Sequence, residues 1–200
     1  MGDTKQNILL TALRLFAKDG YEAVSVSTIA AELGMTKGAL YKHYKNKRDI
    51  FDSIIDRMRC RDAERAGEYD VPVGTLDEMP AEYCAASIGN IVEYAKGQFR
   101  YWTEDEFACC FRRMLALEQF RSEEMSVLYQ QYLVSGPLGY MTDLFESMQI
   151  ENAAESAEKF YGVMFLMYSV YDGADDKAAV TVRLDACLDG FSENLKGSLS

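Results

Sequence analysis

The sequence is poor in the residues that interrupt helices or build covalent and metal-bound frameworks. Its 200 residues include three prolines and one histidine, and the five cysteines form no Cys-x-x-Cys pair. The longest nearly apolar run, residues 161–171, spans 11 residues, whereas a membrane-spanning helix needs about 20. These absences argue against a disulfide framework, a zinc site and a transmembrane segment. We expect reduced, half-buried thiols, and a redox role for the adjacent Cys109 and Cys110 is the alternative.

The common local signatures of catalysis are missing as well. The sequence has no Gly-x-Ser-x-Gly, His-Glu-x-x-His, Walker or Gly-x-Gly-x-x-Gly pattern. We therefore expect no catalytic residue, no metal ligand and no cofactor, and a protein that is not an enzyme. An all-helical enzyme remains an alternative. The opening residues MGDTKQN are polar and do not resemble a secretion signal, so we expect a cytoplasmic protein with no membrane partner.

Charge is distributed unevenly along the chain. The net charge is -11, yet residues 1–48 contain eight Lys or Arg against four acids, and the remaining 152 residues contain 13 against 28. Five of the N-terminal cations lie within residues 37–48. Such a cluster indicates an anionic partner for the N-terminal segment alone. The acidic remainder does not forbid this, because charges more than about 8 Å away are largely screened at physiological salt.

The first fifty residues predict three short helices and the start of a fourth. Apolar residues recur at helical spacing between Thr4 and Phe16, and Gly20 is suited to end that helix. The third helix should run only from Lys37 to about Tyr44. The later helices are expected to start at polar residues that cap helix N-termini, namely Ser25, Thr36 and Asn46, the last in an approximate capping box with Asp49.

A short helix, a glycine turn and a second short helix form the helix-turn-helix plan. In that plan the second helix enters the major groove of DNA, with its N-terminal residues at the base edges. Here that N-terminus reads Thr36-Lys37-Gly38-Ala39. Lys37 can reach the O6 and N7 atoms of guanine, and the small Gly38 and Ala39 let the backbone approach the groove floor. Leu40 and Tyr44 are four residues apart and should face inward.

Two segments within residues 8–51 have a long and specific pattern. They read TALRLFAKDGYEAVSVSTIA (11–30) and GMTKGALYKHYKNKRDIF (34–51). This region resembles the DNA-binding domain of TetR-family transcriptional regulators. The resemblance implies an all-helical homodimer whose larger C-terminal domain binds a small-molecule inducer. Carried over by position, it implies DNA contacts by Ser25, Ser27, Thr36, Lys37, Tyr41, Lys42, His43 and Lys47. Outside this motif, a lone histidine or tyrosine would be interpreted as structural.

We therefore predict an all-α fold in two parts. A three-helix helix-turn-helix DNA-binding domain occupies residues 1–48, and a larger helical domain for ligand binding and dimerisation occupies residues 49–200. No alternating strand pattern and no internal repeat is visible. In the second part the fourth helix should reach about Ala66, a loop follows at 67–80, and further helices are expected at about 81–102, 103–120, 122–136, 140–148, 152–171 and 175–196, with a break at Gly136-Pro137.

The last two helices are candidates for a dimer interface. Residues 161–171 are apolar on nearly every face, so that helix must be covered all round. The last helix has an apolar stripe that could meet its twin in a two-fold contact, formed by Val180, Leu184, Leu188, Phe191 and Leu195. The alternative is that both helices simply complete the core of one chain.

A ligand pocket is expected among the middle helices of the second part. The chain is rich in Met and Tyr, which suits an adaptable apolar pocket with polar tips. Aromatic residues at helical spacing are also ordinary core residues, so both interpretations stay open for the candidates, which are Phe99, Trp102, Phe107, Phe111, Tyr129, Tyr132, Phe165 and Tyr168.

The sequence thus predicts a DNA-binding transcriptional regulator, and more specifically a repressor released by a small-molecule inducer. The expected partners are a palindromic double-stranded DNA operator, an unidentified effector and a second copy of the chain. In one alternative, the acidic helical part is a platform for protein interactions and binds no ligand.

Overall fold

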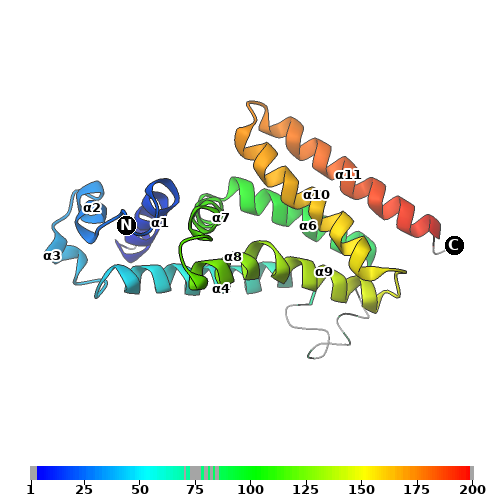
Figure 1. Ribbon diagram of the computed structural model, residues 1–200, viewed down its shortest axis with the longest axis horizontal. Helices are drawn as coiled ribbons and strands as arrows, with labels where there is room; N and C mark the ends of the chain where they lie inside the picture. Colours follow the sequence, from blue (N-terminus) through cyan, green and yellow to red (C-terminus); the bar gives the residue numbers. More distant parts are fainter. Residues whose placement is uncertain are drawn as a thin grey trace. The chain divides into compact units, whose positions relative to one another are not determined.

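The computed structural model describes residues 4–69, 71, 72, 78, 81, 83 and 86–198, and it is helical as predicted (Figure 1). Within those residues no strand occurs. None of the helices there is long and apolar enough to cross a membrane. Most of the loop predicted at 67–80 lies outside the described residues.

The chain divides into two compact units. The first unit contains Met1–Asp62 and Glu106–Tyr129, and the second contains Ala63–Asp105 and Gln130–Ser200. Each unit is thus built from two separate stretches of sequence. The predicted end of the DNA-binding domain, between residues 48 and 49, is a different boundary and stays a prediction.

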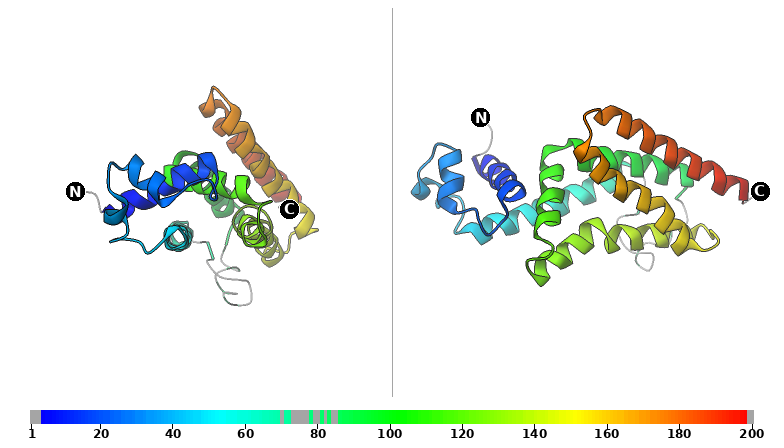
Figure 2. Two further views of the ribbon diagram at one scale, coloured as in Figure 1. Left: turned by 60° about the vertical axis from the view of Figure 1, so that its left-hand side comes forward. Right: turned by 45° about the horizontal axis from the view of Figure 1, so that its top comes forward.

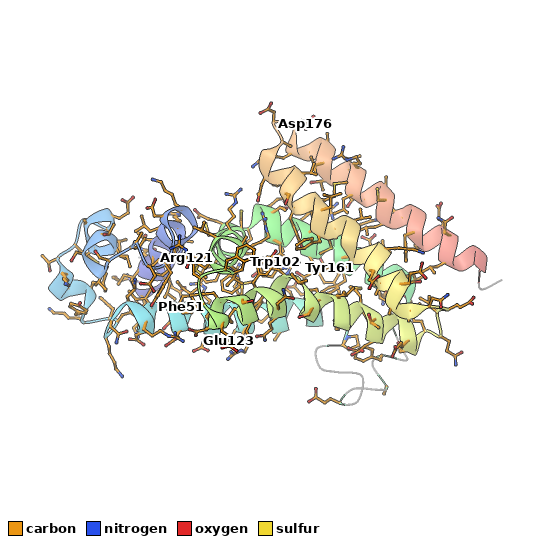
Figure 3. The ribbon with its side chains drawn as sticks, in the orientation of Figure 1. Phe51, Trp102, Arg121, Glu123, Tyr161 and Asp176 are labelled. Atoms are coloured by element: carbon orange, nitrogen blue, oxygen red, sulfur yellow. The ribbon has the colours of Figure 1, made fainter. Side chains whose placement is uncertain are left out.

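The first unit is organised around α1. Its helices are α1 (Thr4–Asp19), α2 (Val26–Glu32), α3 (Lys37–Leu40), the first part of α4 (Lys47–Glu68), α7 (Glu106–Glu118) and the first part of α8 (Glu123–Leu133). α1 packs against α2 and α7. Phe51 of α4 points toward α1 (Figure 3) and is fully buried. The ring of Tyr21 lies 5.1 Å from the rings of both Phe16 and Phe51, so the aromatic residue after Gly20 joins α1 to α4.

The glycine turns and the Asn46 capping box predicted for the first unit are present. Gly20 and Gly34 have φ angles of 88° and 63°, a region that side chains disfavour. The Asn46 side chain accepts from the N–H of Asp49, and the Asp49 carboxylate accepts from the N–H of Lys45, both at 2.8 Å. This is the predicted capping box, except that the second hydrogen bond reaches one residue further back.

The third helix is shorter than predicted. It ends at Leu40, and the chain continues as a turn to His43. The N–H of His43 donates to the carbonyl of Leu40 at 2.9 Å, a three-residue spacing that tightens the last turn.

The second unit packs its helices around aromatic residues. Its helices are the end of α4, α6 (Ile88–Glu104), the end of α8, α9 (Ser135–Ser147), α10 (Ala153–Gly173) and α11 (Lys177–Ser198). α10 and α11 lie side by side in opposite directions (Figure 2). α10 also contacts α9, and α11 contacts α6. The rings of Phe145, Phe160 and Phe191 lie within 5.9 Å of one another and join α9, α10 and α11.

Two helix junctions differ from the prediction. The helix expected over about 103–120 does not start at Thr103, which lies inside α6 with its hydroxyl donating to the Phe99 carbonyl at 2.7 Å, and α7 begins at Glu106. The break expected at Gly136-Pro137 falls instead at Val134, whose φ and ψ of −131° and −91° are not helical. Pro137 then sits in the first turn of α9, where a missing N–H leaves no intrahelical hydrogen bond unmade.

Candidate nucleic-acid interface

Hydroxyl caps fix the starts of α2 and α3. Ser25 accepts from the N–H of Thr28 at 3.0 Å, and Thr36 accepts from the N–H of Ala39 at 3.1 Å. Ser25, Ser27 and Thr36 are all exposed. The hydroxyls therefore hold the two helix N-termini in place and remain accessible to a partner.

Residues 37–44, which form α3 and the turn after it, have one buried and one exposed side. Leu40 is fully buried, and Tyr44 is buried with its hydroxyl donating to the Lys5 carbonyl at 3.3 Å. Both residues face inward, as predicted. The opposite side exposes hydrogen-bond donors and small residues. These residues are Lys37, Gly38, Tyr41 and Lys42, exposed, and Ala39 and His43, partly exposed.

The cations of this exposed side are not neutralised by the protein. Within the part of the chain that the structure describes, Lys37 and Lys42 form no ion pair, and the Lys37 ammonium lies 5.7 Å from the Tyr41 ring centroid. The structure thus leaves two exposed ammonium groups and a phenol hydroxyl next to the capped N-terminus of α3. Such a surface suits the edges and phosphates of a nucleic acid.

Lys47, also a predicted DNA contact, has a different environment. Its ammonium donates to the carbonyl of Tyr21 at 2.8 Å and lies 4.2 Å from that residue's ring centroid. It also lies 3.8 Å from the Glu22 carboxylate, and its side chain is 22% exposed. Lys47 therefore ties the start of α4 to the turn after α1, and its contact with DNA stays a prediction.

Arg48 is paired within the first unit. Its guanidinium lies 2.7 Å from a carboxylate oxygen of Asp52 and 2.5 Å from one of Glu124. Hydrogen bonding to Glu124 raises the pKa of Arg48 and lowers the pKa of Glu124. Both groups stay charged over the physiological range, so Arg48 connects α4 to α8.

The structural role of Glu118 is not indicated by the sequence. This carboxylate, at the end of α7, is 1% exposed and accepts from the N–H of Tyr21 at 3.0 Å. Arg121 lies 3.4 Å from it, in the turn between α7 and α8 (Figure 3). A Cβ atom at Gly20 would come within 2.8 Å of it. Because Glu118 and Tyr21 are 97 residues apart, no local pattern could have indicated this contact.

The predicted ligand residues fall into both units. Phe107, Phe111 and Tyr129 belong to the first unit, and the other five, Phe99, Trp102, Tyr132, Phe165 and Tyr168, belong to the second. Phe99 and Phe111 are fully buried, and Phe99 stacks on Tyr168 with a centroid separation of 5.3 Å. Phe165, by contrast, is 39% exposed. The eight residues are thus divided between the two units, and their contact with a ligand stays a prediction.

The predicted dimer stripe of α11 is already covered in a single chain. Val180, Leu184 and Leu188 are between 0% and 5% exposed, and Phe191 packs on Phe145 and Phe160. Leu195 is partly exposed. The apolar residues that α10 and α11 leave exposed are different ones: Phe165, Leu166 at 60% and Val182 at 68%. The interface with a second copy stays a prediction.

The cysteines described by the structure form no disulfide. Cys60 and Cys187 are exposed, and Cys109 and Cys110 are partly buried on α7; Cys84 lies outside the described residues. Burial raises the pKa of the Cys110 thiol. Because the thiolate is the reactive form, this thiol is less reactive at neutral pH.

Comparison with known proteins agrees with the geometry of the first unit. Residues 8–54 match the family model described as bacterial regulatory proteins, tetR family. In this segment the chain is similar to the tetR family. It is 40% identical over 82 residues to the HTH-type transcriptional regulator AcrR of Shigella flexneri, a match that covers 38% of each chain. The chain thus matches little more than a third of that relative's length.

Solved structures resemble the chain over nearly its whole length. The fatty acid degradation regulator FadR from Bacillus halodurans has a TM-score of 0.62 at 17% identity, with 96% of each chain covered. The SmeT–triclosan complex has a TM-score of 0.61 at 16% identity, covering 94% of this chain and 90% of SmeT. SmeT is the repressor of a multidrug efflux pump of Stenotrophomonas maltophilia. At these identities the likeness shows the fold alone.

Proposed function

We propose that this chain is a transcriptional regulator of the tetR family, a DNA-binding repressor that binds a palindromic operator in the cytoplasm and is released by a small-molecule inducer. The main support is the exposed side of residues 36–43, where Lys37 and Lys42 face solvent beside a capped helix N-terminus and form no ion pair with any described residue. Residues 1–48 supply this surface and form the DNA-binding domain. Lys37 reads a base edge, while Tyr41, Lys42 and His43 contact phosphates.

Two copies of the chain are needed to read a palindrome. Paired recognition helices must lie about 34 Å apart to enter successive major grooves. The exposed apolar residues of α10 and α11 favour a contact between these helices and their copies. A molecule that prefers one dimer geometry then changes operator affinity, and the two affinities are reciprocally coupled.

An effector is supported by the relatives and by the second unit's composition. SmeT was solved with triclosan, and a flavonoid-responsive regulator with a TM-score of 0.55 covers 97% of the chain. The second unit is rich in buried tyrosine, among them Tyr83, Tyr101, Tyr161 and Tyr168. Tyrosine offers both an apolar ring and a polar tip to a bound molecule.

Selection of duplexes from a random DNA library tests the DNA-binding function. The expected product is an inverted repeat whose half-sites are about one helical turn apart. Its complex should weaken steeply with salt, because phosphate contacts release counterions. Enrichment of no sequence, or of single-stranded DNA only, would contradict the proposed function. The same experiment with an effector present separates a repressor from a ligand-independent platform.

A further inference from the structure

Two buried polar atoms without a partner lie at the crossing of α4 and α6. In the part of the chain that the structure describes, the buried side-chain atoms lacking a hydrogen bond are Arg65 Nε, Gln98 Oε1 and Asp185 Oδ1. The first two adjoin Gly97: Arg65 donates through Nη2 to the Gly97 carbonyl at 3.1 Å, and Gln98 is the next residue. Because buried polar groups nearly always have partners, two unpartnered atoms at one place suggest a missing binding partner.

Aromatic rings surround these two atoms. Positions 94, 97, 98 and 101 share one face of α6. The Tyr94 hydroxyl accepts from Gln98 Nε2 at 2.7 Å, and the Tyr101 ring centroid lies 4.3 Å from the Arg65 guanidinium. Arg65 and Gln98 are therefore each held in position by one hydrogen bond, while Arg65 Nε and Gln98 Oε1 have none.

Tyr69 adds a further ring to the same place. Its hydroxyl lies on the backbone of α6, where a Cβ atom at Gly97 would come within 2.1 Å of it. Its ring lies 5.6 Å from that of Tyr94, which in turn lies 6.2 Å from that of Tyr140 on α9. Glycine at position 97 thus permits three tyrosine rings to line up edge to face beside Gln98.

The charge of Arg65 is also unbalanced. No ion pair of Arg65 occurs with any described residue. The other cations of α6 are paired, Lys96 with Asp189 at 2.6 Å and Arg100 with Asp185. In a chain with a net charge of -11, a half-buried arginine with no carboxylate partner among the described residues favours an anionic ligand, since an Arg–carboxylate pair is among the stronger charge-assisted hydrogen bonds.

We propose that Arg65, Gln98 and the tyrosines at 69, 94, 101 and 140 bind a small aromatic anion, a carboxylate or an ionised phenol. Its anionic oxygen accepts from Arg65 Nε, its ring packs among the tyrosine rings, and a hydroxyl on the ring donates to Gln98 Oε1. This molecule is the effector of the regulator, so the inference in that respect rests on the proposed function. None of these residues belongs to the set that the sequence predicted for the ligand.

Calorimetric titration of the full chain without DNA tests the site. The probe is 6-hydroxy-2-naphthoate, and its neutral methyl ester is the matched ligand without the charge. We expect the acid to bind about tenfold more tightly than the ester, and Arg65→Met to remove that difference while retaining the apolar stem of the side chain. Arg59→Met, on the exposed side of α4 (68% exposed), is the matched control and should bind the acid as the parent does.

A second variant, Gln98→Leu, keeps the site testable if Arg65→Met does not fold. Gln98→Leu should lose the preference for 6-hydroxy-2-naphthoate over 2-naphthoate and keep the preference for acid over ester. Quenching of Trp102, the single tryptophan of the chain, is an independent readout, since its ring lies 5.8 Å from that of Tyr101. Equal binding of acid and ester by the parent, or no binding at millimolar probe, would overturn the site, and its two polar atoms would then be satisfied by water.

Operator binding is measured separately, with the acid present and absent. Probe binding that leaves the operator complex unchanged would overturn the effector role and keep the site. Failure of the chain to bind any duplex would overturn the proposed function, but it would not affect the calorimetric test of the site.

Discussion

Lys37 and Lys47 show how the surroundings of a side chain decide its role. Both are lysines of the N-terminal segment, and both match the family motif. The Lys37 ammonium is exposed beside the start of α3, whereas the Lys47 ammonium donates to the Tyr21 carbonyl and is mostly covered. A lysine with its donors already used gains less from a phosphate than one whose donors face solvent.

Lys37→Ala tests base recognition. We expect the variant to lose preference at one position of each half-site, at a cost of about 1–3 kcal/mol per half-site. The measurement is the base preference profile of selected duplexes. Lys18→Ala is the matched control, because Lys18 is an exposed lysine of the last turn of α1. A uniform loss of affinity with an unchanged profile would mean that Lys37 contacts phosphate instead.

Glu118 supports the turn between α1 and α2. Glu118→Ala removes the acceptor of the Tyr21 N–H and leaves a buried donor unsatisfied, so we expect a loss of about 1–3 kcal/mol in the free energy of unfolding. Glu118→Gln retains an acceptor oxygen of nearly the same size and should lose less. Urea unfolding followed by circular dichroism measures both. Equal losses in the two variants would show that the negative charge, through Arg121, matters more than the hydrogen bond.

At the scale of elements, the junction of α8 and α9 depends on one glycine. A Cβ atom at Gly136 would lie 1.9 Å from the carbonyl oxygen of Gln131, which is backbone and cannot rotate away. The close approach is possible because the chain turns at Val134 without a loop. Pro137 tolerates the same turn because its nitrogen needs no partner there.

Gly136→Ala should therefore destabilise the second unit by about 1–3 kcal/mol, since the two helices must move apart. Gly139→Ala is the matched control on the same helix, with no atom within 4 Å of its Cβ. That variant should be neutral or stabilising by about 0.5–1 kcal/mol, because alanine is the better helix former. Thermal unfolding of the two variants side by side measures the difference. Similar melting of both would mean that the junction can relax around a methyl group.

The sequence predicts local features of these elements well. Caps such as Ser25 and Thr36, and glycine turns such as Gly20, depend on residues within four positions of one another, so a single sequence contains the whole interaction. The all-helical fold and the similarity of residues 8–54 to the tetR family model follow from the same short-range patterns. The expected helix start at residue 103 is wrong because the Thr103 hydroxyl donates to the preceding turn of α6, an interaction that competes with capping.

Features that depend on distant residues could not be predicted. The apolar stripe of α11 indicates that Leu184 and Leu188 are buried, but periodicity does not say whether the covering surface belongs to the same chain. The contact of Glu118 with Tyr21 and the crossing of Arg65 with Gly97 join residues 97 and 32 positions apart. Their chemistry depends on packing that only the folded chain provides.

At the scale of the whole molecule, the proposed operator binding requires a second copy. α10 and α11 present Leu166 and Val182 to solvent, at 60% and 68% exposed. Exposed apolar residues on neighbouring helices favour a contact with another surface of the same kind. Asp176 marks the turn that joins these helices (Figure 3), so both can meet a partner as one surface.

Leu166→Glu and Val182→Glu should each convert the dimer to a monomer. A two-fold contact places both new carboxylates in the apolar interface, where they lose hydration without gaining a partner. We expect the dimer dissociation constant to rise by ~100-fold or more, measured by sedimentation velocity. Affinity for the palindrome should fall with it, because the second half-site no longer binds at the high effective concentration that the dimer provides. Val127→Glu is the matched control, since Val127 on α8 is 57% exposed and should leave the dimer intact. Dissociation by Val127→Glu alone would move the interface to α8, and an intact dimer in all three variants would show that the copies meet through other residues.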